Sequence, residues 1–235
     1  MKIQLKDGVD LTELLKIIHY EKPMPKSMDA LGPFPTHLVP KTDEERIQNF
    51  PEVLDELRGK AYVITKKMDG TSGTFIKHEG ELRVCSRNME LKDGNNHHWN
   101  MARKYNLDKV MSDGDVLQAE IIGPGIQKNH SGEKVVNMRL FNVGTTFGRS
   151  YDGASEVIDY GKSNEIPICD VVEFGEDFQY TQEQLLELAD TIKYDNGAQC
   201  EGIVIRPMTE TFSEVLQGRL SFKVISNKFA VKNGE

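Results

Sequence analysis

Apolar and polar residues follow two different periods along this chain of 235 residues. Alternating segments rich in β-branched residues predict strands at residues 61–67, 73–79, 81–87, 115–122, 137–144, 166–174, 198–207 and 220–229. Apolar residues at helical spacing predict helices at residues 95–107 and 181–194. Two shorter helices are expected between Thr42 and Gly59, the second starting near Pro51. Strands mixed with helices, without regular βαβ alternation, indicate an α+β fold of mainly antiparallel sheets flanked by helices.

The first 40 residues differ from the rest because they are rich in proline, which interrupts regular structure. We therefore expect an extended arm or linker at residues 1–40 and one folded domain at residues 41–235. No apolar run has the length of a membrane span, and the N-terminus lacks the apolar core of a secretory signal.

The net charge of −8, taken alone, opposes a nucleic-acid partner, because phosphate contacts need lysine and arginine. Many acidic residues, however, gather in segments predicted as helices and loops, at residues 42–46, 51–57, 173–177 and 183–190. Three cysteines lie far apart and show neither a disulfide framework nor zinc-ligand spacing. This usage favours a reducing, intracellular compartment, the cytoplasm or the nucleus.

Residues 67–70, Lys-Met-Asp-Gly, lie between two predicted strands. Asp-Gly is a common hairpin signal, so this stretch alone favours an ordinary turn. The alternative is a covalent nucleotidyl carrier, in which the amine of Lys67 attacks the α-phosphate of a nucleoside triphosphate. That chemistry needs an unprotonated amine, and hence a pKa lowered by burial or by a neighbouring cation. Gly70 would then let the backbone approach the nucleotide closely.

Four later strands each carry one residue that supports the second interpretation. Glu120 lies inside an apolar strand, and Phe141 stands beside Asn142 in another. Glu201 starts a strand, and Lys223 lies among apolar residues. Each of these is ordinary alone, but their order after Lys-Met-Asp-Gly, on separate strands, is not what a simple turn predicts.

The chain resembles the covalent nucleotidyltransferase superfamily of ATP-dependent ligases and mRNA capping enzymes. The ordered motifs of that superfamily match KMDG, QAEIIG, RLFNV, EGIVIRP and SFKVISNKF in this sequence. The segments VPKTDEERIQN, VCSRN and IIGPGIQKN are similar to RNA ligases, specifically to the RNA ligase 5 branch. The resemblance covers residues 9–235 and implies that residues 41–235 form an adenylyltransferase (nucleotidyltransferase) domain.

The resemblance implies a role for each central motif residue. Lys67 would be the catalytic nucleophile that carries AMP, and Phe141 the ring that stacks on adenine. Glu201 would bind Mg²⁺ or Mn²⁺, and Glu120 would bind the metal or the ribose. Lys223 would contact the α-phosphate and stabilise its negative charge.

The resemblance also implies further nucleotide-binding residues, namely Arg46, Lys66, Asp69, Gly70, Arg87, Asn88 and Lys228. Arg46 would contact the triphosphate from an N-terminal helix, and Arg87 and Asn88 the ribose or the 5′-phosphate of RNA. Two positions depart from the motifs. Lys66 stands where relatives often have a glutamate that touches the adenine. Ile225 stands where they commonly have a second lysine, for which Lys228 is a candidate replacement.

On this resemblance the chain is expected to be an ATP-dependent RNA ligase. Lys67 would take AMP from ATP and pass it to an RNA 5′-phosphate, which a 3′-hydroxyl then attacks to seal the strand. We expect a monomer that acts on nicked duplex RNA. The alternatives are a ligase for DNA or mixed RNA–DNA nicks, a capping-type guanylyltransferase, and a catalytically inactive module that binds nucleotides or RNA ends.

DNA ligases and capping enzymes place an OB domain after their last motif, whereas this sequence ends at Glu235, shortly after Lys223. The RNA ligase 5 branch carries an OB domain before the catalytic domain, and residues 1–25 resemble the segment that leaves it. Residues 1–40 are therefore expected to be a remnant of that connection. If the OB domain is absent, lysine adenylylation is expected to survive better than strand joining.

Overall fold

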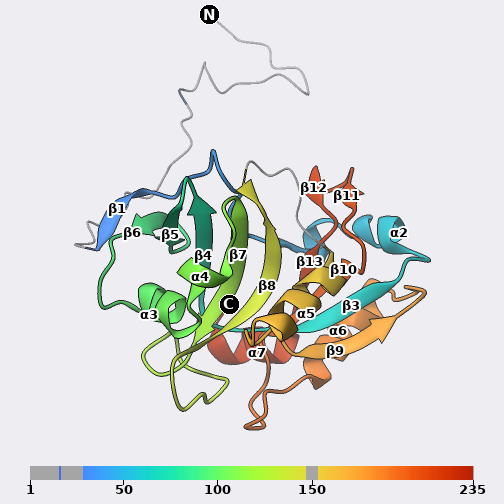
Figure 1. The fold of residues 1–235 in the computed structure, drawn as a ribbon. Coiled ribbons are helices and arrows are strands. Elements are labelled where there is room, and N and C mark those ends of the chain that lie inside the picture. The colour runs from blue at the N-terminus through green and yellow to red at the C-terminus, as the bar shows by residue number, and fades with distance from the viewer. Residues whose placement is uncertain (1–15, 17–28, 147–152, 235) are drawn as a thin grey trace, which may run out of the picture.

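The structure, a computed structural model, describes residue 16, residues 29–146 and residues 153–234, and two β-sheets form its centre (Figure 1). The six-stranded sheet has the order β1 (Ala30–Pro33), β6 (Met89–Leu91), β5 (Glu81–Cys85), β4 (Thr71–His78), β7 (Asp115–Ile122) and β8 (Asn137–Thr145). The five-stranded sheet has the order β2 (Glu45–Arg46), β13 (Phe222–Ile225), β10 (Gly202–Pro207), β3 (Tyr62–Lys67) and β9 (Val171–Gly175). β11 (Phe212–Ser213) and β12 (Gly218–Arg219) form a separate pair. The strands of both sheets pair antiparallel, apart from β2 with β13, which confirms the predicted α+β class.

Helices flank both sheets. α3 (His97–Lys104) and α4 (Leu107–Val110) pack on the six-stranded sheet, and α5 (Ala154–Ser163) packs on β8. α2 (Val53–Leu57) and α6 (Gln182–Thr191) share a core with the five-stranded sheet, and α7 (Asn227–Asn233) lies against α6. The predicted cap of α6 is confirmed, because Thr181 and Gln184 form a reciprocal capping box. None of the described helices combines the length and the apolar content that crossing a membrane requires.

The alternation of side chains along β7 separates the core from the space between the sheets. Leu117, Ala119 and Ile121 are fully buried in the core that α3 and α4 cover. Gln118 and Glu120 point to the opposite face, because successive side chains of a strand alternate. A polar and a charged side chain therefore face away from the apolar core on the same strand.

One prediction near the N-terminus is wrong. The helix expected from Thr42 is replaced by β2 and by the short 3₁₀ helix η1 (Ile47–Asn49), because β2 pairs with β13 at the edge of a sheet. The expected arm at residues 1–40 contains β1, which pairs with β6, and Phe34 and Leu38 after it are buried. The rest of the expected arm, residues 1–15 and 17–28, lies outside the described residues.

Two further elements differ from the predictions. The strand expected to run through residue 229 ends at Ile225, because the side chain of Ser226 accepts a hydrogen bond from Phe229 N and caps α7. Helix α5 was not predicted. Of its buried residues Ala154, Val157 and Gly161, only Val157 is a large apolar residue.

The Lys-Met-Asp-Gly corner joins the two sheets. β3 ends at Lys67 in the five-stranded sheet, and β4 starts at Thr71 in the six-stranded sheet, so the two strands do not pair with each other. The corner is therefore not a hairpin turn. A Cβ atom on Gly70 would lie 2.3 Å from the carbonyl oxygen of Ile121. Glycine is thus required here for close packing against β7, a different reason from the expected approach to a nucleotide.

Candidate active site

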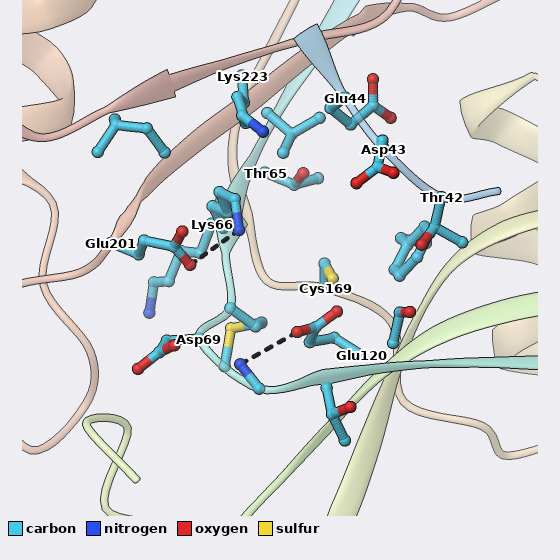
Figure 2. Close-up of a pocket in the computed structure, with 18 of the residues that line it drawn as sticks. Thr42, Asp43, Glu44, Thr65, Lys66, Asp69, Glu120, Cys169, Glu201 and Lys223 are labelled. Atoms are coloured by element: carbon cyan, nitrogen blue, oxygen red, sulfur yellow. Dashed lines mark hydrogen bonds and ion pairs between the residues drawn. The ribbon is translucent and has the colours of Figure 1, made fainter. Parts of the chain in front are cut away.

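A cavity of about 430 Å³ opens between the sheets at this corner (Figure 2). Cavities of this size are typical of small-ligand sites. The predicted residues that line it are Arg46, Lys66, Lys67, Asp69, Gly70, Arg87, Glu120, Phe141, Glu201 and Lys223. The fold therefore brings together residues from five strands, β2, β3, β7, β8 and β13, and from loops beside them.

Lys67 and Glu201 meet because β3 and β10 are antiparallel neighbours. Lys67, the last residue of β3, pairs with Gly202, the first residue of β10, so Glu201 lies directly beside the lysine. Lys67 Nζ donates to Glu201 Oε2 at 2.8 Å. The two side chains are only 24% and 13% exposed. Lys67 is thus an enclosed, ion-paired lysine rather than a solvated turn residue.

Glu120 lies under the corner. On β7 it pairs with Ser72 of β4, and its Oε1 accepts a hydrogen bond of 3.1 Å from Gly70 N (Figure 2). Burial, followed by the negative charge of Glu201, raises the pKa of Glu120 to about 7, although the charge of Lys67 and the Gly70 N–H act in the opposite direction. This carboxyl group therefore loses its proton near neutral pH, unlike an exposed glutamate.

The charge state of Lys67 corrects a sequence-based expectation. Burial lowers the pKa of this amine, but the carboxylates of Glu201, Glu120 and Asp69 outweigh burial and raise it above its ordinary value. The lowered pKa expected from the chemistry is therefore not found in the unliganded protein. Lys67 rests as an ammonium ion, and a change in the surrounding charges is needed before its nitrogen can act as a nucleophile.

Two cations face the carboxylates across the cavity. Lys223 lies on β13, and Arg46 is its neighbour on β2, because these two residues pair in the parallel register. Burial, followed by the charges of Lys67 and Arg46, lowers the pKa of Lys223. Within the described residues, Lys223 makes no ion pair with a carboxylate. Arg46 thus reaches the cavity from an edge strand and not from the expected helix, and both cations face a space suited to phosphate.

An apolar end of the cavity surrounds Phe141. Its ring packs with a cluster that includes Met68, Ile122 and Cys169. Val204 of β10 lines the cavity together with Phe141, Met68 and Cys169. Burial raises the pKa of the Cys169 thiol to about 12, so this sulfur stays neutral. The surface offered here is suited to an aromatic base.

Lys66 and Arg87 line the cavity but are engaged by carboxylates. Lys66 Nζ lies 3.1 Å from Asp170 Oδ2 and 3.2 Å from Asp195 Oδ1. Arg87 Nη2 lies 2.6 Å from Asp43 Oδ1. Lys66, which stands where the motif often has a glutamate, is therefore accommodated by ion pairs with two aspartates that are distant in the sequence.

Asn88 and Lys228 are not among the residues that line this cavity. The side chain of Asn88 accepts a hydrogen bond from Lys41 Nζ at 3.0 Å. Lys228 Nζ donates to the carbonyl oxygen of Asp190 at 3.2 Å, at the end of α6. The structure therefore does not bring Lys228 to the place of the second motif lysine, where Ile225 lines the cavity instead.

Several supporting residues were not identified from the sequence. Tyr194 Oη donates to the carbonyl oxygen of Lys67 at 3.0 Å and accepts from Glu201 N at 3.4 Å. His130 Nδ1 lies 2.6 Å from Asp69 Oδ2. Their signals are weak, because both residues lie outside the matched segments, His130 directly after IIGPGIQKN, and a single tyrosine or histidine there is indistinguishable from a surface residue in the sequence. Arg206 is different, since it lies in EGIVIRP two residues after Val204 and alternation places both on one face.

Glu120 and Glu201 fit a divalent cation. Mg²⁺ is usually held by one or two carboxylates, with waters and substrate phosphates completing its coordination. Among the described residues there is no group of three or more His, Cys, Asp or Glu side chains that would hold a metal ion alone. The donor set therefore suits an ion that binds together with a nucleotide.

Comparisons with known proteins agree with this site. The family described as RNA ligase matches residues 60–225. The structure of Naegleria gruberi RNA ligase with PPi is similar, with 30% identity, a TM-score of 0.80, and coverage of 97% of this chain and 68% of that chain. A lysine-to-alanine mutant of the same ligase with ATP and Mn gives the same values.

A glutamate-to-alanine mutant of the N. gruberi RNA ligase with ATP and Mn is 29% identical, with a TM-score of 0.80, and covers 98% of this chain and 69% of that chain. Among curated proteins, no match to the chain is found. The extent of the family match and the fold likeness at 30% identity together lead to one conclusion. The chain belongs to the RNA ligase family, whose members are ATP-dependent nucleotidyltransferase enzymes.

Proposed function

We propose that this chain is the catalytic part of an ATP-dependent RNA ligase of the RNA ligase 5 branch, in which Lys67 carries AMP. One observation carries the proposal: the enclosed amine of Lys67 lies 2.8 Å from Glu201 in a cavity that also holds Glu120 and Lys223. The N. gruberi RNA ligase structures with ATP and Mn, and with AMP and Mn, support the same nucleotide and a divalent metal here.

In the first step the ammonium group of Lys67 gives up one proton, and the neutral nitrogen then bonds to the α-phosphorus of ATP while the bond to pyrophosphate breaks; the nitrogen releases a second proton to solvent as the phosphoramidate forms. Glu201 orients the nitrogen and, at 2.8 Å, is within reach to accept the first of these protons. Lys223 and Arg46 stabilise the negative charge of the phosphates. When held by Glu120 and Glu201, Mg²⁺ or Mn²⁺ supplies positive charge that offsets both the carboxylates and the triphosphate.

The base binds at the apolar end, where Phe141 stacks on adenine. AMP then passes from Lys67 to the 5′-phosphate of a nicked duplex RNA, and the 3′-hydroxyl attacks the activated phosphate and releases AMP. The protein acts as a monomer. Its three free, buried cysteines favour a reducing, intracellular compartment.

The test is mass spectrometry after incubation with ATP and MgCl₂. Wild-type protein is expected to gain one AMP, and Lys67→Ala to gain none. Lys77→Ala is the matched control, because Lys77 is also a strand lysine with a carboxylate partner, Asp108 Oδ1 at 2.6 Å, but lies outside the cavity. Absence of the adduct in wild-type protein would favour the inactive nucleotide-binding or RNA-end-binding module.

A second experiment separates the RNA ligase from a ligase for DNA or mixed nicks. Nicked duplexes that differ only in the sugars flanking the nick are compared, because the 2′-hydroxyl distinguishes RNA from DNA. Preference for ribose at the nick supports the proposal, and equal sealing of DNA contradicts it. Labelling by GTP in preference to ATP would instead indicate a capping-type guanylyltransferase.

A further inference from the structure

Phe141 occupies a β-bulge in β8. In the register of β7 and β8, Gln118 pairs with Asn142 and Ala119 pairs with Leu140, so Phe141 between them has no partner on β7. A bulge of this kind takes one residue out of the ladder and redirects its side chain. Here the redirected side chain is the aromatic ring that lines the cavity.

The carbonyl oxygen released by the bulge is bound by a residue of the other sheet. Arg206 of β10 donates from Nη1 to Phe141 O at 2.7 Å and to Asn142 Oδ1 at 2.8 Å. Arg206 is only 5% exposed. A buried guanidinium is expensive unless it is hydrogen-bonded, so its position is closely tied to these two acceptors.

The second acceptor is itself fixed. Asn142 Nδ2 donates to Gln118 Oε1 at 2.9 Å, and Gln118 Nε2 donates to Pro40 O at 3.1 Å. Arg219 also donates to Asn142 Oδ1, at 2.7 Å, while its other nitrogens pair with Glu210. Two arginines thus share the Asn142 acceptor, whereas Arg206, and not Arg219, donates to the carbonyl oxygen of Phe141.

We infer that Arg206 is a positioning residue for nucleotide binding: it fixes the bulge so that the ring of Phe141 faces the adenine site. This inference rests on the proposed function, in which that ring stacks on adenine. Without Arg206 the buried carbonyl oxygen loses its charged donor, and the bulge relaxes toward another geometry. The ring is then no longer held in the orientation that favours stacking.

The test measures ATP affinity by titration calorimetry in the full chain carrying Lys67→Met, which cannot form an adduct. Arg206→Met is expected to weaken ATP binding about tenfold, since a displaced ring loses much of the stacking contribution. Phe141→Leu is expected to weaken it about as much. The double variant should bind no more than about twofold worse than Phe141→Leu alone, because both changes remove one interaction.

Arg219→Met is the matched control, since it also removes a hydrogen bond to Asn142 Oδ1 but leaves Phe141 O untouched. Its ATP affinity should stay within about twofold of the parent. Thermal unfolding of each variant checks folding. If Arg206→Met does not fold, Arg206→Lys is used in its place. Its ATP affinity is expected to lie between those of the parent and Phe141→Leu, because lysine keeps the positive charge but has fewer hydrogen-bond donors than arginine.

In the Lys67-intact chain, Arg206→Met should raise the KM for ATP in adduct formation far more than it lowers the rate at saturating ATP. An unchanged ATP affinity in Arg206→Met, or in Arg206→Lys where that variant replaces it, overturns the inference. An equal loss with and without the Phe141 ring also overturns it, because Arg206 would then act on the nucleotide independently. An adduct-free wild-type protein refutes the proposed function alone, since ATP affinity still tests Arg206. Absence of ATP binding in the parent refutes both.

Discussion

Replacing Gly70 with alanine is expected to destabilise the fold and slow adenylylation together. An added Cβ would lie 2.3 Å from the carbonyl oxygen of Ile121 and 2.8 Å from Ile122 Cγ2. To reach a separation of 3.0 Å from that oxygen, the corner must move away from β7 by roughly 0.7 Å. The same movement stretches the hydrogen bond of 3.1 Å from Gly70 N to Glu120 Oε1.

The magnitude follows from these two contacts. Overpacking in a tightly packed region costs about 1–3 kcal/mol. A hydrogen bond to a charged group contributes about 1.5–3 kcal/mol, of which part remains when the bond is only stretched. We therefore expect the free energy of unfolding to fall by about 2–4 kcal/mol, within the total of about 5–15 kcal/mol typical of a domain. A displacement approaching 1 Å at Gly70, three residues after Lys67, should slow AMP transfer by about 10- to 100-fold.

Urea unfolding followed by the fluorescence of Trp99, together with the rate of AMP-adduct formation by mass spectrometry, measures both effects. Gly32→Ala is the control, because its added Cβ meets no atom within 4 Å and Gly32 has no positive φ. Its stability should stay within about 0.5 kcal/mol of wild type. Wild-type stability and rate in Gly70→Ala would refute the packing argument. Lost stability with an unchanged rate would show that the movement does not reach Lys67.

Two further predictions concern the surroundings of the site and the core. Tyr194→Phe removes the hydroxyl that joins Lys67 O to Glu201 N. Adduct formation at saturating ATP should slow about tenfold, while the free energy of unfolding falls by only about 1 kcal/mol. An unchanged rate of adduct formation contradicts this prediction. Burial raises the pKa of the Cys85 thiol from 9.0 to about 12. Above pH 9 the thiol therefore loses its proton in the unfolded chain but keeps it in the folded chain, which favours unfolding. The free energy of unfolding should fall by up to about 1.4 kcal/mol per pH unit between pH 9 and pH 12. Urea unfolding between about pH 8 and 10.5 should show a shallower decline for Cys85→Ala, and an equal decline would exclude this thiol as a cause.

The sequence was informative where local pattern decides the structure. β3, β7 and β10 were predicted because apolar residues dominate short segments bounded by turns. Lys67 ends β3, Glu120 lies inside β7, and Glu201 directly precedes β10, so a correct set of strands already suggested which side chains could meet. The antiparallel register between β3 and β10 then brings two of them together.

The sequence was uninformative where pairing across long distances decides. The acidic segment after Thr42 has the pattern of a helix start, but two of its residues form an edge strand beside β13 because that pairing satisfies the backbone. Lys66 forms an ion pair with Asp195, which is distant in the sequence, and no local pattern predicts this contact. The bulge at Phe141 is equally hidden, since its cause lies in the pairing of two strands rather than in the residue itself.

The acidic net charge of the chain is compatible with a polyanionic substrate, because the cavity contains a group of cations as well as a group of carboxylates. Glu201, Glu120 and Asp69 hold the amine of Lys67 protonated, whereas Lys223 and Arg46 repel each other and Lys67. A phosphate group relieves the repulsion among the cations, and positive charge brought with the nucleotide weakens the hold of the carboxylates on the amine. On the proposed function, the nucleotide and its cation would therefore lower both electrostatic barriers to attack by Lys67.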